Sequence, residues 1–371
     1  MDYRNQLFKY KMLYDLEGSD PLFLEAMKQS IDFHNTNCHD YSRILSQQGF
    51  EANDLKTIGD LHLIPPIPTM FYKSHELSSM LDRKMLIKST TSGTSGHPTK
   101  VGLDARTCYY GAWMLWRTLS YHQLFSLTPA NYIVLGYQPA RYNQMGAVKT
   151  TFGGTCLTPA RHREYALKRN GTGYDLNTAG IAKCLLKYSQ MDVPVRFVGF
   201  PSYFVFLLNQ LNELGIKLRL HPKSKVLLGG GWKQYFTEQV DKPQLYQMTE
   251  EILGIAKCNI KEFFGVVENN LLYCDCKNHH FHVPVYGRVL VRDIKTLKPV
   301  QSGTPGLLNL ITPLVGSMPL GSMITDDIAV MHDGKTCGCG ITSPYFEILG
   351  RIGMSEIKTC AAGANELLGD F

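Results

Sequence analysis

The middle of the chain alternates between two hydrophobic periodicities. Short apolar runs have the length of buried strands, and longer segments between them repeat apolar residues at helical spacing. The strand-like runs are 132–136, 196–200 and 225–228, and the helical segments are 112–124 and 201–211. Strands that alternate with amphipathic helices favour a mostly parallel sheet with helices on both faces. We therefore expect an α/β fold over residues 81–270.

The two ends of the chain have a different pattern. Residues 1–80 are mainly helical in pattern, and three prolines within 65–68 predict an extended connector, because proline fits neither a helix interior nor a central strand. Residues 271–349 hold strand-like runs separated by turns, which predict a smaller β-rich lobe. These runs are 283–291, 306–311 and 328–331. We expect residues 1–349 to form one domain, followed by a short C-terminal tail, 350–371.

The helical segment 112–124 carries a stripe of large apolar residues. Trp113, Trp116 and Leu119 follow one another at helical spacing. Such a stripe packs into a core more often than it binds a cofactor, so we expect these side chains to be buried.

Composition narrows the classes of protein to consider. The 371 residues are 44% hydrophobic and 19% charged, which is typical of a globular protein. The net charge of +6 includes no dense Lys/Arg block, so it suits anionic substrates and gives no argument for nucleic acid. Ten cysteines without a secretory signal, and no apolar run long enough for a bilayer, predict a cytoplasmic protein without a transmembrane segment.

A segment rich in serine, threonine and glycine lies between two short apolar runs, 85–87 and 101–103. It reads Ser89-Thr90-Thr91-Ser92-Gly93-Thr94-Ser95-Gly96-His97-Pro98-Thr99-Lys100. Glycines let backbone N–H groups approach an anion, hydroxyls donate further hydrogen bonds, and the lysine adds positive charge. Two strands around such a loop predict a phosphate-binding hairpin, with Asp104 as the N-cap of the next helix. An ordinary polar turn is the alternative, and Pro98 excludes a Walker A loop.

Further motifs at the ends of predicted strands suit a nucleotide. Gly229-Gly230-Gly231-Trp232-Lys233 removes side chains from a surface on which an adenine ring could lie. In Phe263-Phe264-Gly265-Val266-Val267-Glu268, an aromatic ring could stack on a base and the carboxylate could hold Mg²⁺. A carboxylate of Ser322-Met323-Ile324-Thr325-Asp326-Asp327 could accept hydrogen bonds from ribose hydroxyls. Taken alone, these motifs also fit an ordinary turn, a chance match or a local cap.

These motifs, with Gly350-Arg351 after them, follow the order found in the acyl-adenylate-forming superfamily, which the chain resembles over roughly residues 60–360. Within that superfamily the chain looks most like the LuxE-type acyl-protein synthetases, and next like the phenylacetate-CoA ligases. The segments that carry this resemblance are Pro65–Pro68 with Phe71–Lys73, Leu228–Lys233 and the short tail. It implies an adenylate-forming domain of mostly parallel, helix-covered sheets with a smaller β lobe.

The resemblance also implies roles for single residues. ATP and Mg²⁺ would be the cofactors, and Glu268 would hold the metal ion. The other nucleotide-binding residues would be Thr91, Ser92, Gly93, Thr94, Ser95, Gly96 and Lys100 for the phosphates, Gly230, Gly231, Trp232 and Phe264 for adenine, and Asp326 and Arg351 for ribose.

The tail departs from the wider superfamily, most of whose members carry a mobile C-terminal domain with a catalytic lysine. Only the residues from Ile352 to Phe371 follow Arg351, so Lys100 or Lys358 would have to replace that lysine. Cys360 lies among small residues with Lys358 nearby, and a neighbouring cation raises the thiolate fraction of a cysteine. By resemblance, Cys360 matches the cysteine that carries the acyl group in LuxE-type enzymes. An inert small residue is the alternative.

Two Cys-x-Cys pairs form a second candidate site. The pairs are Cys274 with Cys276 and Cys337 with Cys339, and three histidines, His279, His280 and His282, lie between them. Thiolates and imidazoles are the ligands that Zn²⁺ prefers. The four cysteines therefore predict a structural zinc site, because four protein ligands leave no open position. Unliganded thiols are the alternative.

The resemblance implies an acid–thiol ligase. It would activate a carboxylic acid, expected to be a long-chain fatty acid, as acyl-AMP with the help of Lys100 and Glu268, and transfer the acyl group to Cys360 for an acyl reductase partner. A CoA ligase, with CoA as the acceptor, is the alternative among enzymes. A nucleotide-binding scaffold without catalysis is the alternative from another class.

Overall fold

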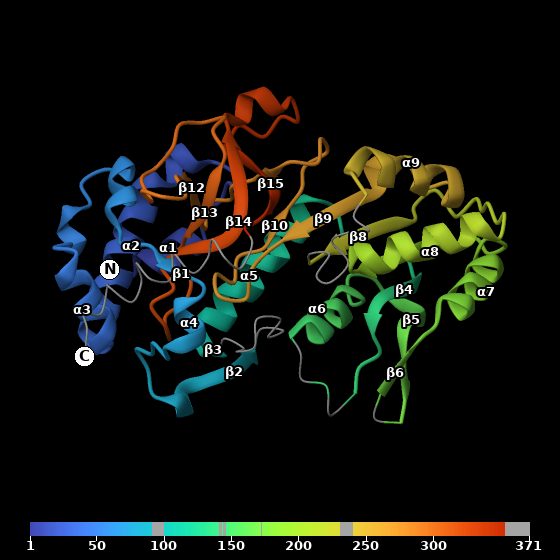
Figure 1. Cartoon of the computed structure of the whole chain (residues 1–371), viewed down its shortest axis with the longest axis horizontal. Helices are drawn as coiled ribbons and strands as arrows, with labels where there is room; N and C mark the ends of the chain where they lie inside the picture. Colours follow the sequence, from blue (N-terminus) through green and yellow to red (C-terminus); the bar gives the residue numbers. More distant parts are fainter. Residues whose placement is uncertain (91–99, 141–142, 144–145, 172, 231–239, 353–371) are drawn as a thin grey trace. The chain divides into compact units, whose positions relative to one another are not determined.

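The computed structural model describes residues 1–352 except 91–99, 141–142, 144–145, 172 and 231–239 (Figure 1). The described residues form two compact units. The first combines Met1–Thr118 with the residues from Gly265 onward, and the second is Leu119–Phe264. The division into parts at residues 80, 270 and 349 stays a prediction, because compactness alone does not define a functional domain.

The second unit is built on a mostly parallel sheet. Its strands are β4 (Ala130–Tyr137), β5 (Ala160–Asn170), β6 (Gly173–Leu176), β7 (Val195–Gly199), β8 (Lys225–Gly229) and β9 (Ile260–Phe264). Within the unit they lie in the order β9-β8-β7-β4-β5-β6, and only β6 is antiparallel to its neighbour. The α/β fold expected from alternating strands and helices is confirmed.

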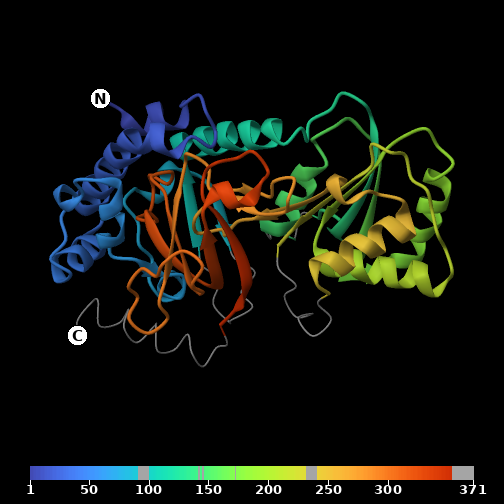
Figure 2. The same cartoon turned by 90° about the horizontal axis from the view of Figure 1, so that it is seen from above.

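Helices pack on both faces of this sheet. They are α6 (Gly146–Gly154), α7 (Thr178–Tyr188), α8 (Pro201–Glu213) and α9 (Lys242–Leu253). Phe197 belongs to the core that α7, α8 and α9 cover, and α8 and α9 run side by side (Figure 2). A Cβ on Gly154 of α6 would lie 2.6 Å from the side chain of Val198. Since neighbouring strand residues point to opposite faces, α6 covers the other side.

The first unit holds an antiparallel sheet and a hairpin. The sheet order is β11 (Phe281–His282), β15 (Tyr345–Arg351), β14 (Ser322–His332), β13 (Gly306–Ile311) and β12 (Arg288–Arg292). The two-residue strand β1 (Ile67–Pro68) pairs in parallel with β14, so the proline-rich connector is extended, as predicted. The β-rich lobe is also confirmed, but the run 283–291 becomes a strand only at Arg288, because a turn closed by Gly287 N–H and Pro284 O precedes it.

The predicted hairpin around the hydroxyl-rich segment is confirmed. Strands β2 (Met85–Thr90) and β3 (Lys100–Asp104) pair antiparallel, and Asp104 Oδ2 accepts the Arg106 N–H at 3.2 Å as the cap of α5 (Ala105–Tyr121). The other α-helices of this unit are α1 (Tyr3–Phe8), α2 (Leu16–Asn37), α3 (His39–Gln47) and α4 (Phe71–Ser74). Short 3₁₀-helices occupy Ala52–Asp54, Ile58–Leu63, Asp82–Lys84 and Gly334–Cys337 here and Lys257–Asn259 in the second unit. Across the described ranges, no helix has both the length and the apolarity to cross a membrane.

The prediction that the stripe on α5 is buried is wrong for its two tryptophans. Trp113 and Trp116 are 37% and 52% exposed, and their rings contact each other at a tilt of 35°, with centroids 5.0 Å apart. Leu119 is buried, as expected. Tyr110 and Met114 are buried in place of the tryptophans, so the core-facing stripe of α5 is rotated away from the indoles.

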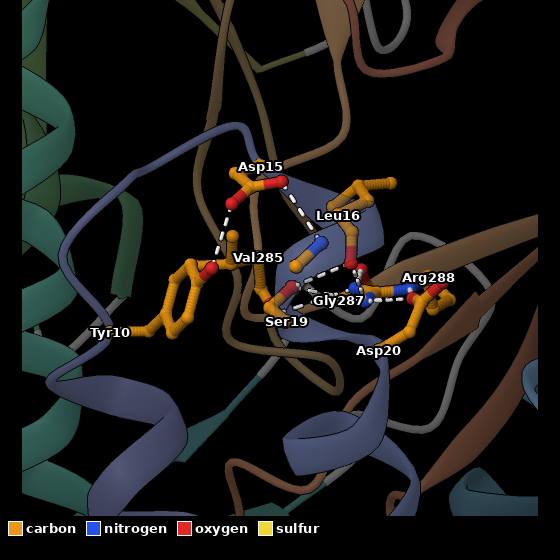
Figure 3. A network of polar contacts seen from close by, with 9 residues as sticks. Tyr10, Asp15, Leu16, Ser19, Asp20, Val285, Gly287 and Arg288 are labelled. Carbon is orange, nitrogen blue, oxygen red and sulfur yellow. Dashed lines mark hydrogen bonds and ion pairs between the residues drawn. The ribbon is translucent and has the colours of Figure 1, made fainter.

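A buried arginine joins the first helices to the β lobe (Figure 3). The Arg288 guanidinium, 9% exposed, donates to Asp20 Oδ1 at 2.6 and 3.1 Å and to Ser19 Oγ at 3.2 Å. It also donates to three backbone carbonyls, those of Leu16, Val285 and Gly287. Burial lowers the pKa of Arg288, but hydrogen bonding and charge from Asp20 oppose that shift. The donors of this cation are therefore taken up by groups from α2 and from the turn that precedes β12.

Removing the Asp20 carboxylate should reveal the free-energy cost of burying the Arg288 guanidinium. We expect Asp20→Ala to lower the free energy of unfolding by about 2–4 kcal/mol, because the guanidinium keeps its burial and loses its counter-charge. Urea unfolding measures the loss. The matched control is Glu25→Ala, which breaks a more exposed ion pair with Lys28 on the same helix and should cost less than about 0.5 kcal/mol. Equal losses in both variants would contradict this role for Arg288.

A buried histidine ties α2 to two loops of the same unit. His34 is 2% exposed, its Nδ1 accepts from Ser79 Oγ at 2.8 Å, and its Nε2–H donates to Val315 O at 3.2 Å. Burial lowers the pKa of His34 from 6.5 to about 4. The folded protein therefore holds this ring neutral at pH values where the unfolded chain binds a proton.

Because of this pKa shift, the free energy of unfolding depends on pH between 6.5 and about 4. The contribution of His34 is fully present above pH 6.5 and is lost as the pH falls from 6.5 towards 4, because the unfolded chain binds the proton first. We expect a loss of at most about 3 kcal/mol across that window. The difference in unfolding free energy between wild type and His34→Gln, measured at steps of pH, should show this slope. The exposed His39→Gln is the control, and a similar slope for both variants would refute the assignment.

Candidate functional site

Two of the predicted adenine-binding residues lie at the carboxyl ends of neighbouring parallel strands in the second unit. Gly230 directly follows β8 and Phe264 ends β9, and Gly229 and Phe263 are paired in register just before them. Gly230 has φ +82°, and a Cβ there would lie 2.8 Å from the Phe200 ring, so the backbone requires glycine. Such strand ends are the usual ligand-binding edge of an α/β sheet. Gly231 and Trp232 lie outside the described residues.

The predicted ribose residues lie in the first unit, where β14 changes its neighbour. On one edge of β14, β1 pairs as far as Ile324, and the Thr69 N–H then donates to Ile324 O at 2.9 Å. Pairing with β15 takes over at Asp327, and the Ile352 N–H donates to Asp326 O at 3.0 Å. The ends of β1 and β15 therefore meet beside Asp326.

Two carboxylates at this junction have different partners. Asp326 Oδ1 accepts from Thr69 Oγ1 at 3.1 Å, whereas Asp327 Oδ1 accepts from Arg351 Nε at 2.7 Å. Asp327 is buried, and Arg351 is 53% exposed. Partial burial lowers the pKa of Arg351, but the nearby carboxylates of Asp327, Asp326 and Glu268 outweigh it and raise the pKa overall. Arg351 is therefore held as a cation next to three acidic groups.

The predicted magnesium ligand belongs to the same electrostatic neighbourhood. Glu268 is 5% exposed in a turn after β9, where the N–H groups of Asn269 and Asn270 donate to Val266 O. Its charge contributes to the raised pKa of Arg351. Carboxylate oxygens are the donors that Mg²⁺ prefers, so the residues present suit this ion. The side-chain amide of the next residue, the buried Asn269, has no hydrogen-bond partner among the described residues.

The phosphate-binding residues are described only at their borders. Lys100 begins β3 opposite Thr90 of β2. The other predicted phosphate residues, Thr91, Ser92, Gly93, Thr94, Ser95 and Gly96, lie outside the described residues, as does the predicted acyl carrier Cys360. Sequence reasoning did not single out Thr69 or Asp327, although the first follows the proline connector and the second sits in the Asp-Asp pair.

The cysteine motifs converge, but with a different fourth ligand. Cys276, His282, Cys337 and Cys339 bring one ligand atom each to within 4.8 Å of the others. Cys274 was predicted in place of His282 and is not in this group; its thiol donates to Asp275 O at 3.7 Å. The reason is that β10 (Tyr273–Cys274) ends at Cys274, so Cys276 lies outside the strand and the spacing of strand residues does not bring the two thiols together. Burial, followed by hydrogen bonds with Cys276 and Cys339, raises the pKa of the metal-free Cys337 thiol to about 12.

Comparison with known families now adds to this geometry. The sequence model of the family described as "Acyl-protein synthetase, LuxE" matches residues 10–369. The chain belongs to the LuxE family of acyl-protein synthetases.

Two relatives that match this LuxE-family chain have the same name. A long-chain-fatty-acid–luciferin-component ligase of Vibrio harveyi is 23% identical over 369 residues, which cover 95% of this chain and 90% of that protein. A protein of the same name from Aliivibrio fischeri is 25% identical over 357 residues, with 91% and 86% covered.

A solved structure shares the fold. The crystal structure of 2-hydroxyisobutyryl-CoA ligase in the postadenylation state, in complex with 2-HIB-AMP, superposes with a TM-score of 0.63 at 16% identity. The match covers 90% of this chain and 68% of that one. The LuxE-family chain therefore has the adenylate-forming fold that its motifs predict.

Proposed function

We propose that this protein is an ATP-dependent acid–thiol ligase that activates a long-chain fatty acid as acyl-AMP and transfers the acyl group to its own Cys360. The family match over residues 10–369 carries the proposal. The acid-lined junction on β14 and the glycine-aromatic strand ends of β8 and β9 support it, because both suit parts of a nucleotide. An acyl reductase is the proposed partner that receives the acyl group.

In the first step, a carboxylate oxygen of the acid attacks the α-phosphorus of ATP, an acyl–phosphate bond forms and pyrophosphate leaves. Lys100 and the hydroxyl-rich segment would bind the phosphates, and Mg²⁺, held by Glu268, would neutralise developing negative charge. Gly230 and Phe264 would contact the adenine ring. Positioning and charge neutralisation are the main contributions that a protein makes to such a step.

Ribose binding falls to the junction on β14. Asp326 uses Oδ1 to accept from Thr69, and no further hydrogen bond to its carboxylate is found among the described residues. Its second oxygen would accept ribose hydroxyl protons, with Thr69 fixing the orientation of the carboxylate. Arg351 keeps its positive charge and a half-exposed side chain, so it would donate to the sugar or to a phosphate.

In the second step, the thiolate of Cys360 attacks the acyl carbonyl, a thioester forms and AMP leaves. A tethered nucleophile acts at a high effective concentration, which favours the protein's own cysteine over a free thiol. The reductase would then take the acyl group from the thioester.

The decisive experiment incubates the full chain with ATP, Mg²⁺ and a panel of labelled carboxylic acids. Pyrophosphate release and the intact protein mass are measured with and without CoA. Acid-dependent pyrophosphate release together with an acyl mass increment supports the proposal. Acyl-CoA formation without protein labelling would identify a CoA ligase, and no acid-dependent release would leave a nucleotide-binding scaffold.

The ribose assignment predicts a specific loss in Asp326→Ala. We expect the apparent KM for ATP to rise about 10- to 100-fold, the equivalent of a hydrogen bond to a charged group. Thr69→Val should have a smaller effect, because it removes only the group that orients the carboxylate. The control Asp333→Ala lies in the same lobe and caps a 3₁₀ turn away from the junction, so its KM should stay at the wild-type value. An unchanged KM in folded Asp326→Ala would place the ribose elsewhere.

The acceptor assignment predicts that Cys360→Ser separates the two steps. ATP–pyrophosphate exchange should remain near the wild-type rate, because adenylation does not use the thiol, whereas covalent acylation of the protein should disappear. The exposed Cys258→Ser is the matched control and should keep both activities. Acylation that survives in Cys360→Ser would move the acceptor to another thiol, and loss of exchange would mean that this residue helps to build the adenylation site.

A further inference from the structure

We propose that Cys276, His282, Cys337 and Cys339 bind one structural zinc ion. Its ligands include neither Cys360 nor any residue proposed to bind the nucleotide. The four ligands come from two parts of the chain that are far apart in the sequence: Cys276 lies between β10 and β11 and His282 ends β11, whereas Cys337 and Cys339 lie between β14 and β15.

The distances between the ligand atoms fit a tetrahedron around Zn²⁺. With Zn–S near 2.3 Å and Zn–N near 2.0 Å, the edges of such a tetrahedron measure about 3.5–3.8 Å. Cys276 Sγ lies 3.6 Å from Cys337 Sγ, and Cys339 Sγ lies 3.2 Å from His282 Nε2. All four atoms lie within 4.8 Å of one another, so small side-chain adjustments complete the geometry.

Each sulfur has a nitrogen within hydrogen-bond distance. Cys276 Sγ accepts the Asn278 N–H at 3.3 Å, and Cys339 Sγ accepts the Ile341 N–H at 3.3 Å. In both cases the donor follows the cysteine by two residues. Cys337 Sγ lies 3.2 Å from His280 Nδ1, within hydrogen-bond distance. Polar groups placed around the sulfurs in this way are the outer contacts that orient the ligands of a metal site.

The histidine ligand has a fixed tautomer. His282 Nδ1–H donates to Ser343 O at 2.7 Å, which leaves the Nε2 lone pair directed at the three sulfurs. A metal-binding histidine in proteins usually has its other nitrogen held in this way. The softness of the donors selects Zn²⁺ over Mg²⁺ or Ca²⁺, which prefer oxygen ligands.

The number of protein ligands also indicates that the zinc ion has a structural role. Three of them, Cys276, His282 and Cys337, are buried, and no position is left for a substrate or a water molecule. The ion would cross-link residues 61 positions apart and would hold the start of β15 against the β10–β11 loop. Its contribution is therefore to the folded state of the β lobe, because a preformed set of ligands does not exist in the unfolded chain.

The test begins with the full chain purified without chelator. Metal analysis should find about one zinc per chain, and replacement by Co²⁺ should give the intense visible bands of tetrahedral thiolate coordination. A mercurial reagent should release the zinc, and alkylation with mass measurement should show three thiols that become reactive only then. The proposal would be overturned by metal-free protein with the same thermal stability as zinc-loaded protein, or by a disulfide between Cys276 and Cys337 in place of metal.

Variants distinguish this set of three cysteines and one histidine from the set of four cysteines that the sequence predicted. His282→Ala and Cys339→Ser should lose the zinc and lower the midpoint of thermal unfolding by at least about 5 °C. Cys274→Ser is the matched control, because this buried thiol lies two residues from Cys276 and outside the cluster, and it should keep the full zinc content. Zinc lost in Cys274→Ser but kept in His282→Ala would refute the site. If a variant does not fold, the release experiment on wild type still decides the matter.

Discussion

Strand β14 changes its neighbour part-way along its length, and the candidate site of the first unit depends on where this happens. Two backbone carbonyls at the change are already paired, since Ile324 O accepts from Thr69 and Asp326 O accepts from Ile352. The side chain of Asp326 can therefore serve something other than the sheet. Thr69 and Asp326 are 257 positions apart in the sequence. The short proline-containing strand β1, which pairs with β14, places Thr69 beside Asp326.

Two arginines of the first unit differ in burial and in the number of donors that their contacts leave over. Arg288 is 9% exposed and spends its donors on Asp20, Ser19 and backbone carbonyls of the same unit. Arg351 is 53% exposed and, within the described residues, donates only to Asp327. A guanidinium has five donors, so Arg351 retains capacity for a ligand, whereas Arg288 has none to spare. The comparison therefore fits a structural role for Arg288 and the proposed ligand-binding role of Arg351.

Local patterns predicted most of the elements, and contacts over long sequence distances account for what they missed. Strands such as β4 and β8 follow from buried apolar runs, and the β2–β3 hairpin follows from the turn chemistry between them. The tryptophans of α5 were misplaced because helical spacing identifies a face without saying which of two apolar faces meets the core. Cys274 was preferred to His282 because the regular spacing of the Cys-x-Cys pairs concealed that β10 ends between the two thiols.

The proposed zinc site precedes β15, and the proposed nucleotide-binding junction lies at the end of this strand. Strand β15 begins six residues after Cys339 and ends at Arg351, which is paired directly opposite Asp327 on β14. A slip of one residue would turn every side chain of β15 to the opposite face, and the Arg351–Asp327 pair would be lost. The pairing already shifts once, between Ile328 and Ala329, so the ladder alone does not specify the register along its whole length. An ion bound by Cys337 and Cys339 would fix the entry of β15 in space, and the register that places Arg351 beside the acidic junction would follow from it.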